Sequence, residues 1–244
     1  TGPKLSTMGC GGLGNLSRSE QSTLTTFSSW SSWDSQGSSL AAADVATTSQ
    51  DIGVPVLSKR SSDYEIAFDF LGRATTGHVV SAVEKATQKE VAIKTFRLDR
   101  LSRKCRQDML REIRTQALVD HPCVAKLEGV YSSPSHMCLV IERLIGGSLL
   151  DALRREGPLR ESRAASAVEQ LLHAVGHLHE RGLVHRDVNL KNFMFESRRR
   201  DRLKLIDFGV CKPWEEGMEP MTRICGTTGC MAPELAKRSY TNKV

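Results

Sequence analysis

The chain has 244 residues, which is enough for one domain or for a domain built of two lobes. Hydrophobic residues make up 39% and charged residues 25%, a balance typical of a soluble globular protein. No segment approaches the ~20 consecutive apolar residues of a membrane span, and nothing resembles a secretory signal. The net charge of +6 would suit a nucleic-acid or membrane partner, but solvated lysines and arginines explain it more simply. The 7 cysteines lack paired C-x-x-C spacing, which indicates reduced thiols in a cytoplasmic protein.

Residues 1–62 differ in composition from the rest of the chain. A stretch such as "SRSEQSTLTTFSSWSSWDSQGSS" is rich in Ser and Thr, carries few aliphatic residues and has no helical or strand period. Such a segment cannot bury enough apolar surface to offset its chain entropy, so a disordered leader is expected. Its "MGC" at Met8 is a weak lipidation signal, because Leu13 stands where myristoylation requires Ser or Thr.

The chain after Tyr64 alternates in polarity as β-strands do, with turn residues between the runs. Gly72 and Gly77 flank a tight segment, as expected for a hairpin that folds over a ligand or for two ordinary hairpin glycines. In "EVAIKTF" the period of two places Ala92 and Lys94 on one face of a strand. A lysine in the middle of a strand is unusual unless its ammonium group meets an anion.

The next segment predicts a helix that could supply this anion. In "DMLREIRTQALVDHP", the residues Leu110, Ile113, Ala117 and Leu118 recur at helical spacing. Glu112 stands beside Ile113 on the inward side, although a surface position is the simpler explanation of Glu112 taken alone.

A second amphipathic helix is predicted in "ESRAASAVEQLLHAVGHLHERG". Its expected apolar stripe consists of Val168, Leu171, Val175 and Leu178, and Gly182 marks its C-terminal end. A strand, a glycine connector and a short helix are predicted before it, in "MCLVIERLIGGSLLDAL".

The stretch "GLVHRDVNLKNFMF", residues 182–195, places several charges within what otherwise looks like a buried apolar strand. Charges inside an apolar run are costly unless they are paired, bind a metal or take part in chemistry. Two further motifs follow, "LKLIDFGV" at 203–210 and "CGTTGCMAPE" at 225–234.

Taken in order, "GRATTGHV", "VAIK", "HRDVNLKN", "DFG" and "APE" resemble the signature elements of the eukaryotic protein kinase domain. These motifs look most like those of the calcium/calmodulin-regulated and calcium-dependent Ser/Thr kinases. The resemblance implies an α+β fold of two lobes, with a small antiparallel-sheet lobe at about 64–140 and a mainly helical lobe at about 145–244. The kinase domain, 63–244, is expected to be incomplete, because the family's C-terminal helices would follow Val244.

The resemblance also implies roles for the charged residues in ATP-dependent phosphoryl transfer. Lys94 would hold the α- and β-phosphates of ATP, and Glu112 would orient Lys94. Asp187 would accept the proton of the substrate hydroxyl, and Lys191 stands where many tyrosine kinases carry an arginine. Mg²⁺ prefers hard oxygen ligands, and the residues expected to bind it are Asn192 and Asp207.

The nucleotide is expected to lie against residues of the glycine loop, the following strands and the connector: Gly72, Ala74, Gly77, Val79, Ala92, Lys94, Glu142, Leu144 and Met194. Among these, the backbone of Glu142 and Leu144 would pair with the adenine edge. Ile141 would close the pocket behind the adenine.

Four positions depart from the family pattern. Ala74 replaces a loop glycine, and Asn189 stands two residues after the catalytic Asp, where Ser/Thr kinases usually carry Lys. Ser148 replaces an acidic residue, and Gln116 occupies a usually apolar helix position, where it could weaken the active placement of the helix. Thr227 in "CGTTGCMAPE" is nevertheless typical of Ser/Thr kinases, so Ser/Thr specificity is favoured.

Two other functional classes stay open. A pseudokinase or ATP-binding scaffold is disfavoured because the charged residues of all the motifs are present. A nucleic-acid binder through "SRRRDRLK" at 197–204 is disfavoured because no aromatic residues interleave with that run, and a solvated hairpin turn explains it. The expected partners are ATP and a protein substrate, without nucleic acid. A calcium-sensing or regulatory segment would have to lie beyond Val244, since no EF-hand pattern occurs within the chain.

Regulation is expected to involve Arg186, which precedes the catalytic Asp. In the family such an arginine often pairs with an acidic or phosphorylated group on the segment that here spans 207–234. Thr222 is the hydroxyl best placed to carry a phosphate, which could order the segment through charge-assisted bonds. The alternative is that Glu219, or no charged group at all, fills this role.

Overall fold

The computed structural model describes residues 60–74, 77–133 and 135–244. Of the leader predicted over 1–62, only the last three residues are among those described. Thr75 and Thr76 of the glycine loop also lie outside the described residues.

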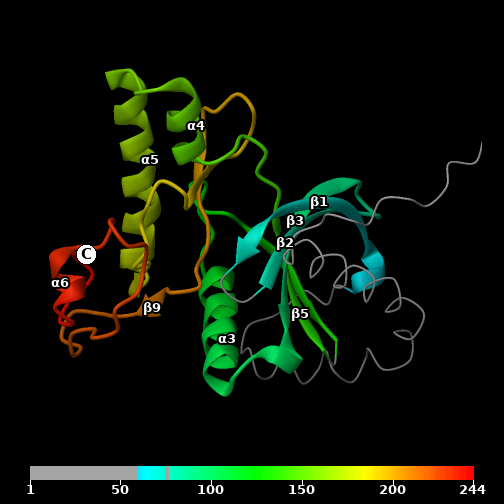
Figure 1. Cartoon of the computed structure of the whole chain (residues 1–244), viewed down its shortest axis with the longest axis horizontal. Helices are drawn as coiled ribbons and strands as arrows, with labels where there is room; N and C mark the ends of the chain where they lie inside the picture. Colours follow the sequence, from blue (N-terminus) through cyan, green and yellow to red (C-terminus); the bar gives the residue numbers. More distant parts are fainter. Residues whose placement is uncertain (1–59, 75–76, 134) are drawn as a thin grey trace, which may run out of the picture. The chain divides into compact units, whose positions relative to one another are not determined.

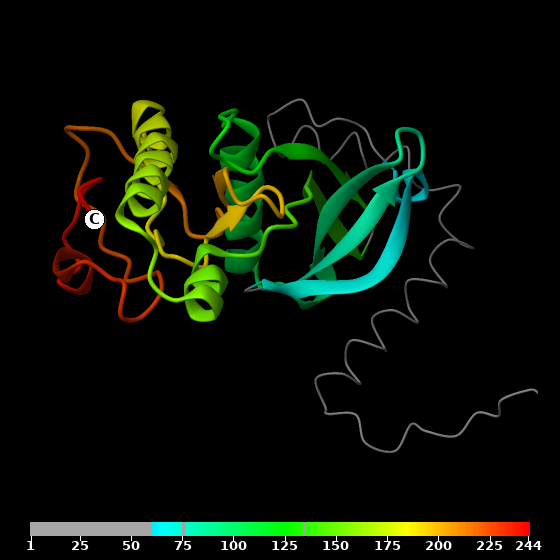
Figure 2. The ribbon, with the colours of Figure 1, turned by 90° about the horizontal axis from the view of Figure 1, so that it is seen from above.

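A five-stranded antiparallel sheet forms the first half of the described chain (Figures 1 and 2). Its strands lie in the order β1-β2-β3-β5-β4, with the bounds β1 Tyr64–Ala74, β2 Gly77–Glu84, β3 Lys89–Arg97, β4 Leu127–Ser132 and β5 His136–Glu142. Short 3₁₀ turns precede β1 at Ser61–Asp63 and follow β3 at Leu98–Arg100. Gly77 permits a close approach of β2 to β3, because a Cβ atom there would lie 1.8 Å from the carbonyl oxygen of Thr95. The predicted antiparallel-sheet lobe is confirmed.

Helix α3 (Arg103–Ala117) packs on this sheet. It begins after Ser102, whose Oγ accepts a hydrogen bond from the backbone N–H of Cys105 at 3.2 Å. The core between helix and sheet consists of Phe96, Met109, Ile113, Val130, Met137 and Leu139.

The inward face of α3 differs from the predicted apolar stripe. Ile113 is buried as predicted, but Ala117 and Leu118 are exposed, and Leu118 shows 59% of its surface. Glu112 is buried beside Ile113, as predicted, and Gln116 joins the buried face although this was not predicted. The prediction was wrong at the end of this helix because polar side chains there have buried hydrogen-bond partners, which outweighs the simple preference for apolar residues.

The second half of the described chain contains three helices, joined by short strands and long connecting segments (Figure 1). Its helices are α4 (Leu149–Glu156), α5 (Glu161–Glu180) and the short α6 (Pro233–Ala236). Two small two-stranded antiparallel sheets accompany them, formed by β6 (Leu183–Val184) with β9 (Lys212–Pro213) and by β7 (Phe193–Phe195) with β8 (Leu203–Leu205). Among the described residues, no helix combines the length and apolar character that crossing a membrane requires.

The inward face of α5 contains Leu171 and Leu178 as predicted, but Ala167 and Ala174 take the places predicted for Val168 and Val175. It consists of Ala167, Leu171, Ala174 and Leu178, whereas Val168 is 52% exposed. The two alanines allow the helix backbone to approach the β7–β8 hairpin closely, so small residues mark the inward face. The prediction for Val168 was wrong because it counted only large apolar side chains.

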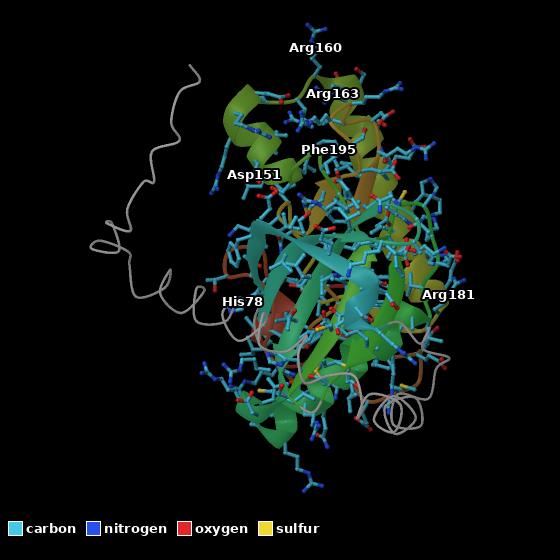
Figure 3. All side chains as sticks on the ribbon, turned by 90° about the vertical axis from the view of Figure 1, so that its right-hand side faces the viewer. His78, Asp151, Arg160, Arg163, Arg181 and Phe195 are labelled. Carbon is cyan, nitrogen blue, oxygen red and sulfur yellow. The ribbon has the colours of Figure 1, made fainter. Side chains whose placement is uncertain are left out.

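Only the first part of the basic run at 197–204 forms the turn of the β7–β8 hairpin, as the solvated-turn interpretation predicts, whereas Leu203 and Lys204 belong to β8 and are buried. The charges of the run meet carboxylates: Arg200 pairs with Glu156 of α4, and Lys204 pairs with Glu142 at 2.7 Å. Arg163 of α5 lies at the same end of the molecule and approaches Glu156 at 3.8 Å (Figure 3).

The burial of Ala174 and the exposure of Val168 give the first testable prediction. Replacing the fully buried Ala174 with Leu should lower the free energy of unfolding by about 1–3 kcal/mol, because the added atoms overpack a close contact. Val168→Ala, at an exposed position of the same helix, should change it by less than about 0.5 kcal/mol. Urea unfolding followed by circular dichroism measures both. A larger loss for Val168→Ala than for Ala174→Leu would contradict the assignment of the buried face.

Candidate active site

A buried lysine lies at the centre of the site. Lys94, in the middle of β3, is 6% exposed, and its Nζ pairs with the carboxylate of Glu112 on α3 and with Oδ1 of Asp207 at 3.2 Å. Burial acts to lower the pKa of Lys94, but the two carboxylates outweigh it and raise this pKa above its ordinary value. The ammonium group is therefore charged, and the anion predicted to meet it is present.

Asp207 follows β8 and faces this lysine. Burial opposes ionisation of Asp207, but attraction to Lys94 and a 3.3 Å hydrogen bond from the Gly209 backbone N–H hold the pKa of its carboxyl below the usual range. Asp207 has a φ of +63° and Arg186 a φ of +66°, values that residues with side chains rarely adopt. Such backbone strain clusters at functional sites, which agrees with the position of both residues beside the candidate catalytic groups.

Asp187 lies in the loop between β6 and β7, where three donors hold its carboxylate. Its Oδ1 accepts hydrogen bonds from Nδ2 of Asn189 and from the backbone N–H of Thr227, both at 2.8 Å. Its Oδ2 accepts a hydrogen bond from Nδ2 of Asn192 at 3.0 Å. These neutral donors fix the orientation of the carboxylate.

Asn192 and Asp207, the predicted Mg²⁺ ligands, belong to adjoining segments, because the Ile206 backbone N–H donates to the carbonyl of Asn192 at 2.8 Å. The amide nitrogen of Asn192 serves Asp187, which leaves its amide oxygen to face a metal ion. Within 60–74, 77–133 and 135–244, no group of three or more His, Cys, Asp or Glu side chains is arranged to hold a metal. Two oxygen donors without a full protein cage suit Mg²⁺, which keeps water ligands and shares substrate phosphates.

The β1–β2 hairpin carries the predicted glycine loop. Gly72 pairs with Val79 and Ala74 pairs with Gly77 across the hairpin. Val79 also lies opposite Lys94 in the β2–β3 register. The predicted loop and the buried lysine therefore belong to one continuous part of the sheet.

The predicted adenine partners come from both halves of the described chain. Ala92 on β3 and Met194 on β7 are partly buried, and Leu144 is buried in the connector after β5. The backbone N–H of Glu142 donates to the carbonyl of Lys126 at 3.0 Å, so this N–H is not available to an adenine edge.

Two of the sequence predictions are modified by the structure. Lys191 contributes only its backbone N–H, which donates to Oδ1 of Asn189 at 2.9 Å, while its side chain is exposed. Its catalytic role stays a prediction. Gln116, expected to weaken the placement of α3, donates from Nε2 to the carbonyl of Ala125 at 3.2 Å, so its buried amide has a partner.

Two contacts were missed at the sequence level. Asn189 was recognised as a departure from the family, but not as the residue that joins Asp187 to the hydroxyl of Thr227, to which it donates at 3.1 Å. The carboxylate of Glu142 accepts two bonds from Nζ of the buried Lys204, at 2.8 and 2.7 Å, and ties the end of β5 to β8. The only sequence signal for this pair is a lysine between apolar residues in "LKLI".

Comparison with known proteins identifies the family. The protein kinase domain family matches residues 66–244. Human calcium/calmodulin-dependent protein kinase type IV is 36% identical over 178 residues, which cover 72% of this chain and 36% of that protein. A probable myosin light chain kinase of Dictyostelium discoideum is 34% identical over 166 residues, which cover 68% and 52% of the two chains.

CBL-interacting protein kinase 24 of Oryza sativa subsp. japonica is 32% identical over 178 residues, which cover 72% of this chain and 39% of that protein. The chain therefore spans only about a third to a half of the length of these relatives. The family match, the two-lobed fold and the cluster around Lys94 agree with one another. This chain belongs to the protein kinase family.

Proposed function

We propose that this chain transfers the γ-phosphate of ATP to Ser or Thr hydroxyl groups of protein substrates. The observation that carries the proposal is the buried contact of Lys94 with Glu112 and Asp207. Asp187, oriented by neutral donors, lies in the loop that adjoins Asp207. A scaffold without transfer activity would have no need for both features, so the pseudokinase alternative is disfavoured.

Phosphoryl transfer depends mainly on positioning and on neutralising charge. The ammonium group of Lys94, oriented by Glu112, would bind the α- and β-phosphates of ATP. Asp207 and the amide oxygen of Asn192 would hold Mg²⁺, which supplies positive charge to the phosphates when bound. Asp187 would accept the proton of the attacking hydroxyl, and its hydrogen bonds with Asn189 and the Thr227 N–H would keep it aimed.

Ser/Thr specificity is supported by the contact of Thr227 with the catalytic loop and by the kinases to which the chain is similar. The calcium/calmodulin dependence named for the human relative supports a proposal that calcium regulates this domain through a segment beyond Val244. The cysteines within the described residues are unpaired, which supports a reducing, cytoplasmic location.

The direct test uses the intact protein with radiolabelled ATP and Mg²⁺. Peptides that are identical except for a Ser, Thr or Tyr acceptor serve as substrates. We expect label on the Ser and Thr peptides, and loss of that label when EDTA removes Mg²⁺. Nucleotide binding without transfer to any acceptor would instead establish the scaffold, and label confined to the Tyr peptide would overturn the specificity.

Asp187→Asn should lower the rate of transfer by at least about a hundredfold, because the amide cannot accept the hydroxyl proton. ATP affinity should change by less than about threefold, since Asp187 serves the hydroxyl and not the phosphates. Steady-state transfer and a fluorescent-nucleotide titration measure the two effects. Asp201→Asn, on the exposed β7–β8 turn, is the matched control and should leave both unchanged. Full transfer activity in Asp187→Asn would remove Asp187 from the chemistry.

Lys94→Met should reduce transfer by at least about a hundredfold, which corresponds to roughly 2.7 kcal/mol of barrier. The reason is that the methionine removes the only ammonium group held between Glu112 and Asp207. Lys89→Met, at an exposed position of the same strand, should retain activity. Circular dichroism must show that both variants are folded. Equal activity of the two folded variants would rule out the phosphate-binding role of Lys94.

A further inference from the structure

An arginine late in the segment 207–234 pairs with helix α3. Nη1 of Arg223 lies 3.2 Å from Oδ2 and 3.3 Å from Oδ1 of Asp108. Arg111, three residues further along α3, donates to Oδ1 of the same carboxylate at 2.6 Å. Burial opposes ionisation of Asp108, but the two arginines outweigh it and lower the pKa of its carboxyl. Asp108 is therefore a charged acceptor between α3 and this segment.

Asp108 begins a polar line along α3. Asp108, Glu112 and Gln116 follow one another at intervals of four residues, so their side chains lie on one side of the helix. Each binds a different part of the domain: Arg223 of segment 207–234, Lys94 of β3, and the carbonyl of Ala125, respectively. A shift of the helix that broke the contact of Asp108 with Arg223 would also strain the contact of Glu112 with Lys94, because the same helix carries Asp108 and Glu112.

Arg223 is also fixed to the catalytic loop. The hydroxyl of the buried Tyr240 donates to the backbone carbonyl of Arg223 and accepts a hydrogen bond from Nη1 of Arg186 at 3.2 Å. Nε of Arg186 donates to the carbonyl of Val210 at 2.7 Å. Arg186 thus contacts segment 207–234, as expected, but through a backbone carbonyl. Neutral groups anchor the catalytic loop to the segment, and the Arg223 side chain extends the connection to α3.

We propose that Asp108 and Arg223 form a positioning pair that couples segment 207–234 to helix α3 and thereby keeps Glu112 on Lys94. This inference rests on the proposed kinase function of the same site. Neither residue touches the phosphates or the hydroxyl, so the pair acts through Glu112. The pair supplies a protein-borne negative charge on α3 for a cation of the segment, and this coupling needs no phosphate on the exposed Thr222.

The pair is partly exposed, with 21% of the Asp108 side chain and 45% of the Arg223 side chain accessible. Partly exposed ion pairs contribute little to global stability, so loss of this pair should leave the fold intact. Its effect should appear in the equilibrium between α3 positions, where a charge-assisted contact from the single Nη1 nitrogen to the Asp108 carboxylate can change populations several-fold.

A double-mutant cycle in the intact protein tests the proposal. Asp108→Asn and Arg223→Gln should each lower kcat by about three- to tenfold. The double variant should lose no more than Asp108→Asn alone, because that change already removes the ion pair with Arg223 together with the one to Arg111. The charge-swapped variant, Asp108→Arg with Arg223→Asp, should recover kcat to within about threefold of the unmodified protein, which a purely local packing role would not allow.

Arg97 and Asp99 provide the matched control, because they form a 2.6 Å surface ion pair after β3 that does not involve segment 207–234. Arg97→Gln and Asp99→Asn should leave kcat unchanged. Thr222→Ala should also retain kcat.

Hydrogen exchange keeps the test independent of catalysis. Amide exchange in residues 103–117 should increase several-fold in Arg223→Gln and return to the rate of the unmodified protein in the charge-swapped variant, while exchange in the control variants stays the same.

An inactive unmodified protein would refute the proposed function but not this coupling, because the exchange data alone decide whether the coupling exists. Unchanged exchange and kcat in both folded single variants, additive losses in the double variant, or a loss in Thr222→Ala equal to that in Arg223→Gln would each overturn the proposal.

Discussion

The ammonium group of Lys94 is withdrawn from water, and this burial is the constraint on which the site depends. A buried charge of this kind is expensive unless opposite charges and good geometry compensate it. The compensating carboxylates belong to Glu112 on α3 and to Asp207 after β8, which are 18 and 113 residues away from Lys94 in the chain. The sheet, the helix and the later loop must therefore all be in place before Lys94 is satisfied. The candidate site can therefore form only together with the fold around it.

The carboxylates of Asp207 and Asp187 have different surroundings. Asp207 is paired with a cation, as suits a group that shares charge with phosphates and a metal ion. Asp187 is instead held by amide and backbone donors from Asn189, Asn192 and Thr227. These neutral donors orient the carboxylate of Asp187 without placing a second charge beside it. Asn189, which stands where related enzymes usually carry Lys, therefore has a clear structural role in this chain.

Helix α3 packs with both apolar and polar side chains. Its inward surface combines an apolar core around Ile113 with the polar line of Asp108, Glu112 and Gln116. Each of these three residues binds a different segment, so the position of the helix depends on several parts of the domain at once. The free-energy cost of burying these polar groups is moderate, because each of them has a hydrogen-bond or ion-pair partner. A helix held in this way can be shifted by changing one contact without unfolding.

The sequence by itself determined the family, the two-lobed fold, the strand that carries Lys94 and the helix that carries Glu112. These follow from local periodicity and from motifs that keep their order, which neighbouring residues specify. The inward faces of α3 and α5 were only partly predicted, because Leu118 and Val168 are exposed while Gln116 and Ala174 are buried. Only the tertiary structure decided the contacts of Asn189 with Thr227 and of Asp108 with Arg223, which are 38 and 115 residues apart. Such pairs leave no local pattern, because their energy depends on partners that folding alone brings within hydrogen-bond distance.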